Sequence, residues 1–274
     1  MKRRRGYSCA VTFSHRVRGA AASAASATFG AVARMRHRKP IHPSGIVVPA
    51  RVVRHGLAEP LGAPWLDEPG SGEGVARISR SAGFPDGWPD VWGLAVRVDA
   101  PGSPSGVADL MLGTSFRGRA TRHALALRNG LRAPLTCVLP YRTQSGRLVT
   151  IGVPERSAQL PGHRDELSAH LARHPLALTL AVAAEGQPWR PFGTLTFGGA
   201  VLGTGDGSDG SEGTGPDGRP HEGRADISFE PVLNPLPGLV LPEPLATIRS
   251  RSYAGARAGR GADPATVHRL PSRQ

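Results

Sequence analysis

The sequence predicts a mainly β fold of the α+β class, built as an antiparallel barrel or sandwich with a few peripheral helices. The first observation is the content of turn-forming residues: 36 glycines and 26 prolines among 274 residues favour frequent turns over long helices. The second is a series of short Val- and Leu-rich stretches, each bounded by Gly, Pro or Asp, which recurs from residue 45 onward.

The expected elements follow in chain order. Single strands are predicted at residues 45–53, 74–79, 91–100, 107–115 and 135–142. A hairpin is predicted within residues 139–155, with its turn at Gln144-Ser145-Gly146. A second, long pair of strands is predicted at 175–185 and 190–199, joined through Gly186-Gln187-Pro188. One helix is expected between Pro161 and Pro175, because Leu160, Leu167 and Leu171 form an apolar stripe and Asp165 and Glu166 lie in its first turns.

The net charge of +13 is concentrated at the two ends of the chain. Residues 1–40 hold ten Lys or Arg and no acid, and residues 246–274 hold six Arg and one Asp, which leaves 18 basic and 20 acidic residues between. A nucleic-acid-binding domain normally carries its positive surface on the folded body. We therefore expect no specific nucleic-acid partner.

The composition also predicts how the chain is divided. Residues 1–38 are expected to be a basic, disordered extension, residues 39–262 one folded domain, and residues 263–274 a tail. Within the domain, residues 203–225 contain almost nothing that could be buried, so they are expected to form a flexible, acidic, Gly-rich loop. Its acids lack the periodicity of a calcium-binding loop.

The cysteines and the apolar runs indicate the compartment. Cys9 and Cys137 have neither metal-ligand spacing nor the number needed for a disulfide framework, which favours a reducing, cytoplasmic location. Ser23, Ser26 and Thr28 interrupt the N-terminal Ala-rich run, so no export signal is expected. No run is long enough to predict a membrane span.

Three stretches carry a resemblance to a known family. They are KPIHPSG (39–45), VARISRSAGFPDGWPDVWGLAVRV (75–98) followed by VADLMLGTS, and FEPVLNPLPGL (229–239) followed by RSRSYAGARAGR (249–260). In this order, from about residue 39 to 262, they resemble the haem catalase superfamily, in a small form like the minimal catalase-related peroxidases. The resemblance implies a catalase-like antiparallel barrel that binds haem b.

The resemblance also implies a role for each matching residue. Tyr253 would ligate the haem iron with Arg249 as its charge partner, Arg77 and Arg260 would bind the propionates, and His42 would move the peroxide proton with Ser79 orienting it. Elementary chemistry agrees with these roles. A neutral imidazole can accept and return a proton, and a nearby guanidinium favours a phenolate.

The sequence departs from the family at the position of the catalase Asn, which here reads Gly113-Thr114-Ser115. Thr114, the residue assigned to the site, or its neighbour Ser115 is expected to hydrogen-bond the peroxide instead. These departures favour a peroxidase or hydroperoxide-metabolising reaction on a small-molecule peroxide, and the alternative is a non-catalytic catalase-fold binding protein. A hydrolase such as a phosphodiesterase finds no supporting motif, and a homo-oligomeric state stays open.

Histidines and tryptophans make up two further sets of residues. His170 and His174, four apart on the expected helix with Glu166 one turn earlier, have the spacing of a zinc pair but lack a further ligand. The tryptophans are expected to pack the barrel, and two histidines are expected at its surface or lining: Trp65, Trp88, Trp92, Trp189, His55 and His123.

Overall fold

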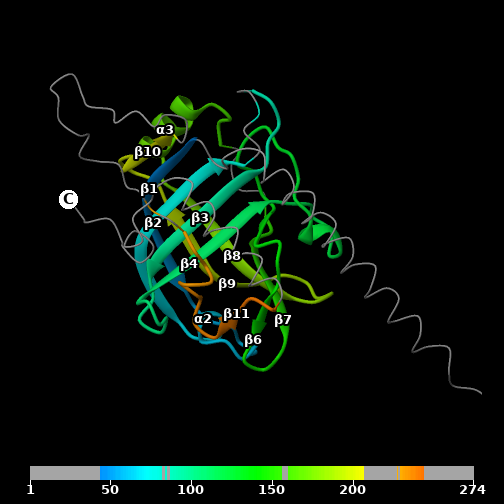
Figure 1. The fold of residues 1–274 in the computed structure, drawn as a ribbon. Helices are drawn as coiled ribbons and strands as arrows, with labels where there is room; N and C mark the ends of the chain where they lie inside the picture. The colour runs from blue at the N-terminus through cyan, green and yellow to red at the C-terminus, as the bar shows by residue number, and fades with distance from the viewer. Residues whose placement is uncertain are drawn as a thin grey trace, which may run out of the picture. The chain divides into compact units, whose positions relative to one another are not determined.

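The computed structural model describes residues 44–81, 84, 87–155, 160–206, 227 and 229–243. Their main feature is a closed antiparallel barrel of eight strands (Figure 1). The barrel strands are β1 (Ser44–Arg54), β2 (Gly70–Arg80), β3 (Trp92–Asp99), β4 (Val107–Thr114), β5 (Leu135–Thr136), β7 (Leu148–Val153), β8 (Leu176–Ala184) and β9 (Arg190–Phe197). They follow the order β7-β5-β4-β3-β2-β1-β9-β8, and the pairing of β8 with β7 closes the ring.

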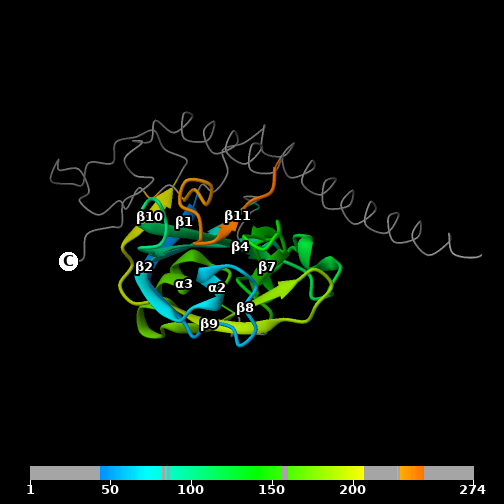
Figure 2. The same ribbon diagram turned by 90° about the horizontal axis from the view of Figure 1, so that it is seen from below.

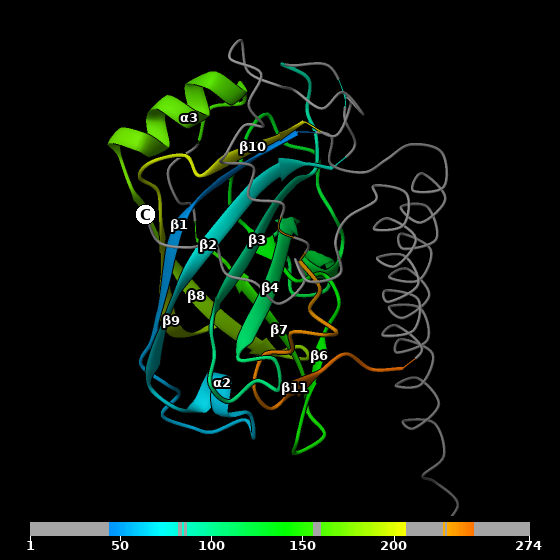
Figure 3. The same ribbon diagram turned by 60° about the vertical axis from the view of Figure 1, so that its left-hand side comes forward.

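The remaining elements extend or cap the barrel. They are β6 (Tyr141–Thr143), β10 (Gly203–Asp206), β11 (Leu239–Val240), the helices α2 (Pro64–Asp67) and α3 (Arg164–Arg173), and a 3-10 turn at Thr121–His123. The two helices lie near opposite ends of the barrel (Figure 3). No helix in the described part of the chain is long and apolar enough to span a membrane.

The barrel interior is the main hydrophobic core, and strand alternation explains its composition. Along β1, Ile46, Val48, Ala50 and Val52 point inward and are buried, whereas Arg51 on the other face is exposed. The other strands fill the same interior with aliphatic side chains and with buried aromatics that include Trp92, Phe192 and Phe197. Apolar residues at every second position therefore build a continuous core from strands that are mostly short.

A second, smaller layer covers the outer face of β1–β4. Val47, Val75, Ala95 and Phe229 form a separate buried cluster there. Phe229 begins the segment 229–243, which runs across this side of the sheet and includes β11 (Figure 2). The outer face of these four strands is thus partly internal, unlike the outward faces of most surface strands.

Most sequence predictions for the fold are confirmed. The protein is mainly β and the hairpin turns at Gly146. The expected helix is α3, in which Leu167 and Leu171 are buried, whereas Leu160 is buried four residues before the helix begins. The sandwich alternative is wrong, because the sheet closes on itself.

Three predictions need correction. The single strand at 135–142 is two, β5 and β6, because Val138 adopts a positive φ of 56° that an extended strand cannot accommodate. The start of the 203–225 loop is β10, since Gly203–Asp206 supplies backbone groups that pair with β1. Trp88 is 64% exposed and so does not pack the barrel, whereas Trp65 and Trp92 are buried.

Candidate functional site

Two of the predicted site residues lie together on β2. Arg77 and Ser79 are two positions apart, so both project from the outer face of the barrel, while Ala76 and Ile78 point into the core. Ser79 is buried and Arg77 is half-buried. The same outer face carries the layer formed by the segment 229–243, so these two side chains lie at a covered surface rather than in open solvent.

A strip of small residues runs across four strands at the level of Ser79. In the strand register, Ser79 pairs with Gly45 on one side and Gly93 on the other, and Gly93 pairs with Gly113. We call Gly45, Ser79, Gly93 and Gly113 the glycine strip. Because three of its four residues have no side chain, the strip keeps side-chain bulk away from the backbone next to a cation.

The Arg77 guanidinium lies against one end of this strip. A Cβ at Gly45 would stand 2.7 Å from Arg77 Nε, so a larger residue there would displace the guanidinium. At the other end, a Cβ at Gly113 would stand 3.0 Å from Leu125 Cδ2. At Gly93, between them, the first atom that a Cβ would meet is Ser79 Oγ at 3.4 Å, which is an ordinary contact distance. The middle of the strip is its least crowded part.

These described residues fit part of a haem site. A strip without bulky side chains leaves room for one face of a planar macrocycle, a guanidinium matches the geometry of a propionate carboxylate, and a hydroxyl can orient a neighbouring group. His42, Arg249, Tyr253 and Arg260 lie outside the described residues, so the iron ligand and the proton-transferring group stay predictions from the sequence.

The structure places Thr114 away from this surface. Thr114 is fully buried at the end of β4, on the face opposite to Gly113 and hence opposite to the glycine strip. Its hydroxyl donates a hydrogen bond to the Ala126 carbonyl (2.6 Å) and accepts one from the Trp92 amide (3.1 Å). The predicted contact between Thr114 and a peroxide does not agree with this placement, since the hydroxyl is already engaged with the backbone.

A buried ion pair in the next rows of the same face was missed from the sequence. Arg97 Nε and Nη2 donate to the two carboxylate oxygens of Asp109, both at 2.7 Å, and neither side chain is exposed. Asp109 Oδ2 also accepts from the Glu230 amide (2.6 Å) and from Asn234 Nδ2 (2.9 Å). This pair therefore attaches the segment 229–243 to the sheet. The available signal was an Arg and an Asp on adjacent strands, which becomes specific only once the register is known.

The other candidates from the sequence assemble no site among the described residues. The rings of His170 and His174 lie 5.2 Å apart, but no third metal-ligating group joins them in the part of the chain that the structure describes. His123 is half-buried with Nδ1 3.1 Å from the Val138 carbonyl, and burial lowers its pKa from the ordinary 6.5. His55 is exposed, as expected for a surface residue.

The closed eight-strand antiparallel barrel and its covered outer face define a protein with a catalase-like fold. The chain is similar to a fungal catalase, with 11% identity over 81% of this chain and 59% of that chain at a TM-score of 0.52. It is also similar to catalase A from Saccharomyces cerevisiae, with 12% identity over 85% of this chain and 62% of that chain at a TM-score of 0.55. The chain thus spans about three fifths of the length of these catalases. No protein-family model matches the sequence, and neither does any curated protein. At this identity the likeness establishes the fold.

Proposed function

We propose that this protein binds haem b on the outer face of β1–β4 and has peroxidase or hydroperoxide-metabolising activity. The observation that carries the proposal is the position of Arg77 against the glycine strip, which itself contains Ser79, on a catalase-like barrel. Both residues are also candidates from the sequence motifs alone, so two independent arguments meet at this surface. The strip lacks bulky side chains, and Arg77 offers a cation at its edge.

Each residue has a role that its chemistry supports. Arg77 and Arg260 would hold the two propionates, with Tyr253 as the iron ligand and Arg249 opposing the charge of its phenolate. His42 would accept the peroxide proton and return it, and the Ser79 hydroxyl would fix the orientation of that imidazole. The haem, when bound, supplies the redox chemistry of peroxide reduction.

The inward orientation of Thr114 favours a second candidate, a catalase-fold protein that binds a ligand without turnover. With Thr114 engaged inside the barrel, the glycine strip offers one side-chain hydroxyl, that of Ser79, and no side-chain amide for a bound peroxide. Fewer fixed donors at the reacting oxygen mean weaker stabilisation of the charge that develops on it. Activity measurements must therefore accompany haem binding.

The test is the absorption spectrum of the full chain purified after expression with ample haem, together with turnover of hydrogen peroxide and of cumene hydroperoxide. Wild type is expected to show one Soret band per chain, Tyr253→Phe to lose or shift it, and Arg77→Gln to retain less haem. Arg51→Gln is the matched control, because Arg51 also projects from the outer face of the barrel but is exposed and pairs with Glu73.

The outcomes separate the two candidates. Bound haem with turnover of either peroxide supports the proposed enzyme, whereas bound haem without turnover supports the binding protein. Wild type that retains no haem overturns the proposed haem enzyme and leaves a catalase-fold protein that binds another ligand. Equal haem loss in Arg77→Gln and Arg51→Gln would show that Arg77 is not part of the haem site.

A further inference from the structure

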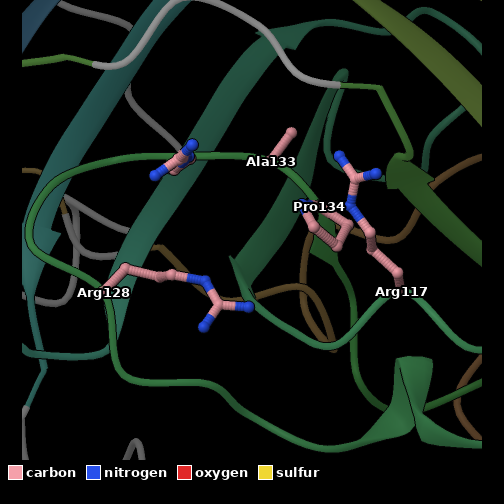
Figure 4. A pocket seen from close by; sticks show the side chains of 5 residues that line it. Arg117, Arg128, Ala133 and Pro134 are labelled. Carbon is pink, nitrogen blue, oxygen red and sulfur yellow. The ribbon is translucent and has the colours of Figure 1, made fainter.

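A pocket of about 250 Å³ opens beyond the end of β4, and arginines dominate its lining (Figure 4). Its walls are Arg117, Arg128, Arg132, Ala133 and Pro134. None of these residues belongs to the glycine strip or has a role in the proposed haem site. Three guanidinium groups around one concavity make an unusual surface, because like charges repel unless something of opposite charge lies between them.

The backbone that carries this pocket is fixed by hydrogen bonds. Arg128 exchanges two backbone hydrogen bonds with Asp90, at 2.9 and 2.8 Å. The Pro134 carbonyl accepts from both the amide and the hydroxyl of Ser115, at 3.0 and 3.3 Å, and Ala133 and Pro134 are buried. The floor and one wall are therefore preformed, which lowers the ordering cost of binding a ligand.

The Arg128 side chain is also held in place. Its Nη2 donates to the Ser115 carbonyl (3.3 Å) and its Nη1 to the Leu127 carbonyl (3.2 Å), and its guanidinium lies over the Phe116 ring at 5.8 Å. Figure 4 shows this guanidinium directed across the pocket, with Arg117 rising beside the Pro134 ring on the opposite side. The two cations thus approach the same space from different walls.

The positive charge of the pocket is not neutralised within the described part of the chain. Arg117, Arg128 and Arg132 take part in no ion pair there. Asp90 is the acid whose backbone adjoins Arg128, but its carboxylate is fully buried against Arg80 (3.4 Å) and the Val91 amide (2.6 Å). The pocket consequently presents several forked donors to an anion.

We propose that this pocket binds the phosphate group of a small phosphate monoester. One guanidinium fork satisfies both oxygens of a carboxylate, whereas the three terminal oxygens of a phosphate monoester can use donors from three sides. A second pocket of about 250 Å³ shares Arg128 and Arg132 and adds Pro89, Leu127, Asn129 and Gly130. It provides room for the organic part, with the exposed Leu127 as an apolar contact.

The experiment is calorimetric titration of the full chain with phenyl phosphate, inorganic phosphate and benzoate at low and physiological salt. Phenyl phosphate is expected to bind more tightly than benzoate, and Arg117→Gln/Arg132→Gln is expected to weaken it by about tenfold or more. Arg117 and Arg132 are exposed, so their loss leaves the core unchanged. The matched control is Arg142→Gln/Arg147→Gln, which removes the same charge from the exposed β6–β7 hairpin and should change binding less than about twofold.

Three results would overturn the proposal. They are the absence of saturable phosphate binding, equal weakening in the pocket variant and the hairpin control, and benzoate binding as tightly as phenyl phosphate. If a single-stranded oligonucleotide binds but phenyl phosphate does not, the proposal of a small-molecule site is also rejected, and the arginines form a nucleic-acid-binding surface instead. None of these outcomes depends on haem binding.

Discussion

Replacing Arg97 by Met should destabilise the protein strongly, because it leaves the Asp109 carboxylate charged, buried and without its cation. The pair is bidentate at 2.7 Å and fully buried. Breaking a buried pair by removing one partner costs about 3–5 kcal/mol. For a chain of this size that corresponds to a fall of about 6–20 °C in the midpoint of thermal unfolding.

The measurement is a double-mutant cycle with Asp109→Asn, followed by urea unfolding and by thermal unfolding. Asp109→Asn removes the charge but keeps one oxygen that can accept from the Glu230 amide. The double variant should therefore be much less unstable than the sum of the two single variants. Hydrogen exchange at the Glu230 amide, which donates to Asp109 Oδ2 at 2.6 Å, should quicken in both single variants.

Arg51→Met is the matched control for this cycle. Arg51 also projects from the outer face of the barrel, but its pair with Glu73 is long (3.6 Å) and about half exposed on both sides. Such a pair contributes about 0–1 kcal/mol. If Arg97→Met is no more destabilising than Arg51→Met, or if the Arg97 and Asp109 effects simply add, the buried pair does not hold the outer layer as argued.

Three other predictions follow from the structure. Thr114→Val should lower the free energy of unfolding in urea by about 1–3 kcal/mol, since the buried Trp92 amide loses its acceptor, and it should leave haem retention unchanged. Loss of haem without loss of stability would instead indicate that Thr114 contributes to the haem site. Gly146 and Gly238 have similar positive φ values of 80° and 77°, but a new Cβ would collide with Pro64 only at Gly238. Gly238→Ala should therefore lower the midpoint of thermal unfolding more than Gly146→Ala, and equal effects would show that backbone strain alone matters. Because burial lowers the pKa of His123 below 6.5, the unfolded chain binds the proton more readily than the folded protein does, and the free energy of unfolding should fall as pH drops below about 6.5. The His123→Gln variant should show a flatter pH dependence of the free energy of unfolding. An NMR titration midpoint of His123 at or above 6.5 would contradict the reasoning.

Much of the fold could be predicted from local patterns, and the exceptions have identifiable causes. Apolar residues at alternate positions and turn residues between them located β1, β3, β4, β8 and β9 within a few residues. The two-residue strand β5 carries too few positions to show a period, and β10 is rich in glycine and has no apolar alternation at all. Pairing with a distant strand, which sequence patterns do not encode, gives both segments their extended conformation.

The same limit explains which predicted site residues share one face of the sheet. Arg77 and Ser79 share a face because they are two apart on one strand, a relation that a single sequence contains. Placing Thr114 beside them requires the register between β2, β3 and β4, because β3 lies between the other two strands. The observed register puts Gly113, not Thr114, opposite Gly93. A shift of one residue exchanges the inner and outer faces, so a motif match that is off by one position yields a side chain inside the barrel.

The outer face of β1–β4 therefore carries the glycine strip and the buried ion pair within three successive rows. One row is the glycine strip with Ser79, the next holds Arg77, and the one after that holds Arg97 opposite Asp109. The Arg97–Asp109 pair does not point toward the strip; it binds the backbone of Glu230 and the side chain of Asn234, which begin the segment that leads toward Arg249 and Tyr253. A buried ion pair is a weak source of stability compared with an apolar pair of the same size. Geometry explains its presence better, because a carboxylate with four donors fixes where the segment 229–243 starts relative to the strip, which apolar contact does not do.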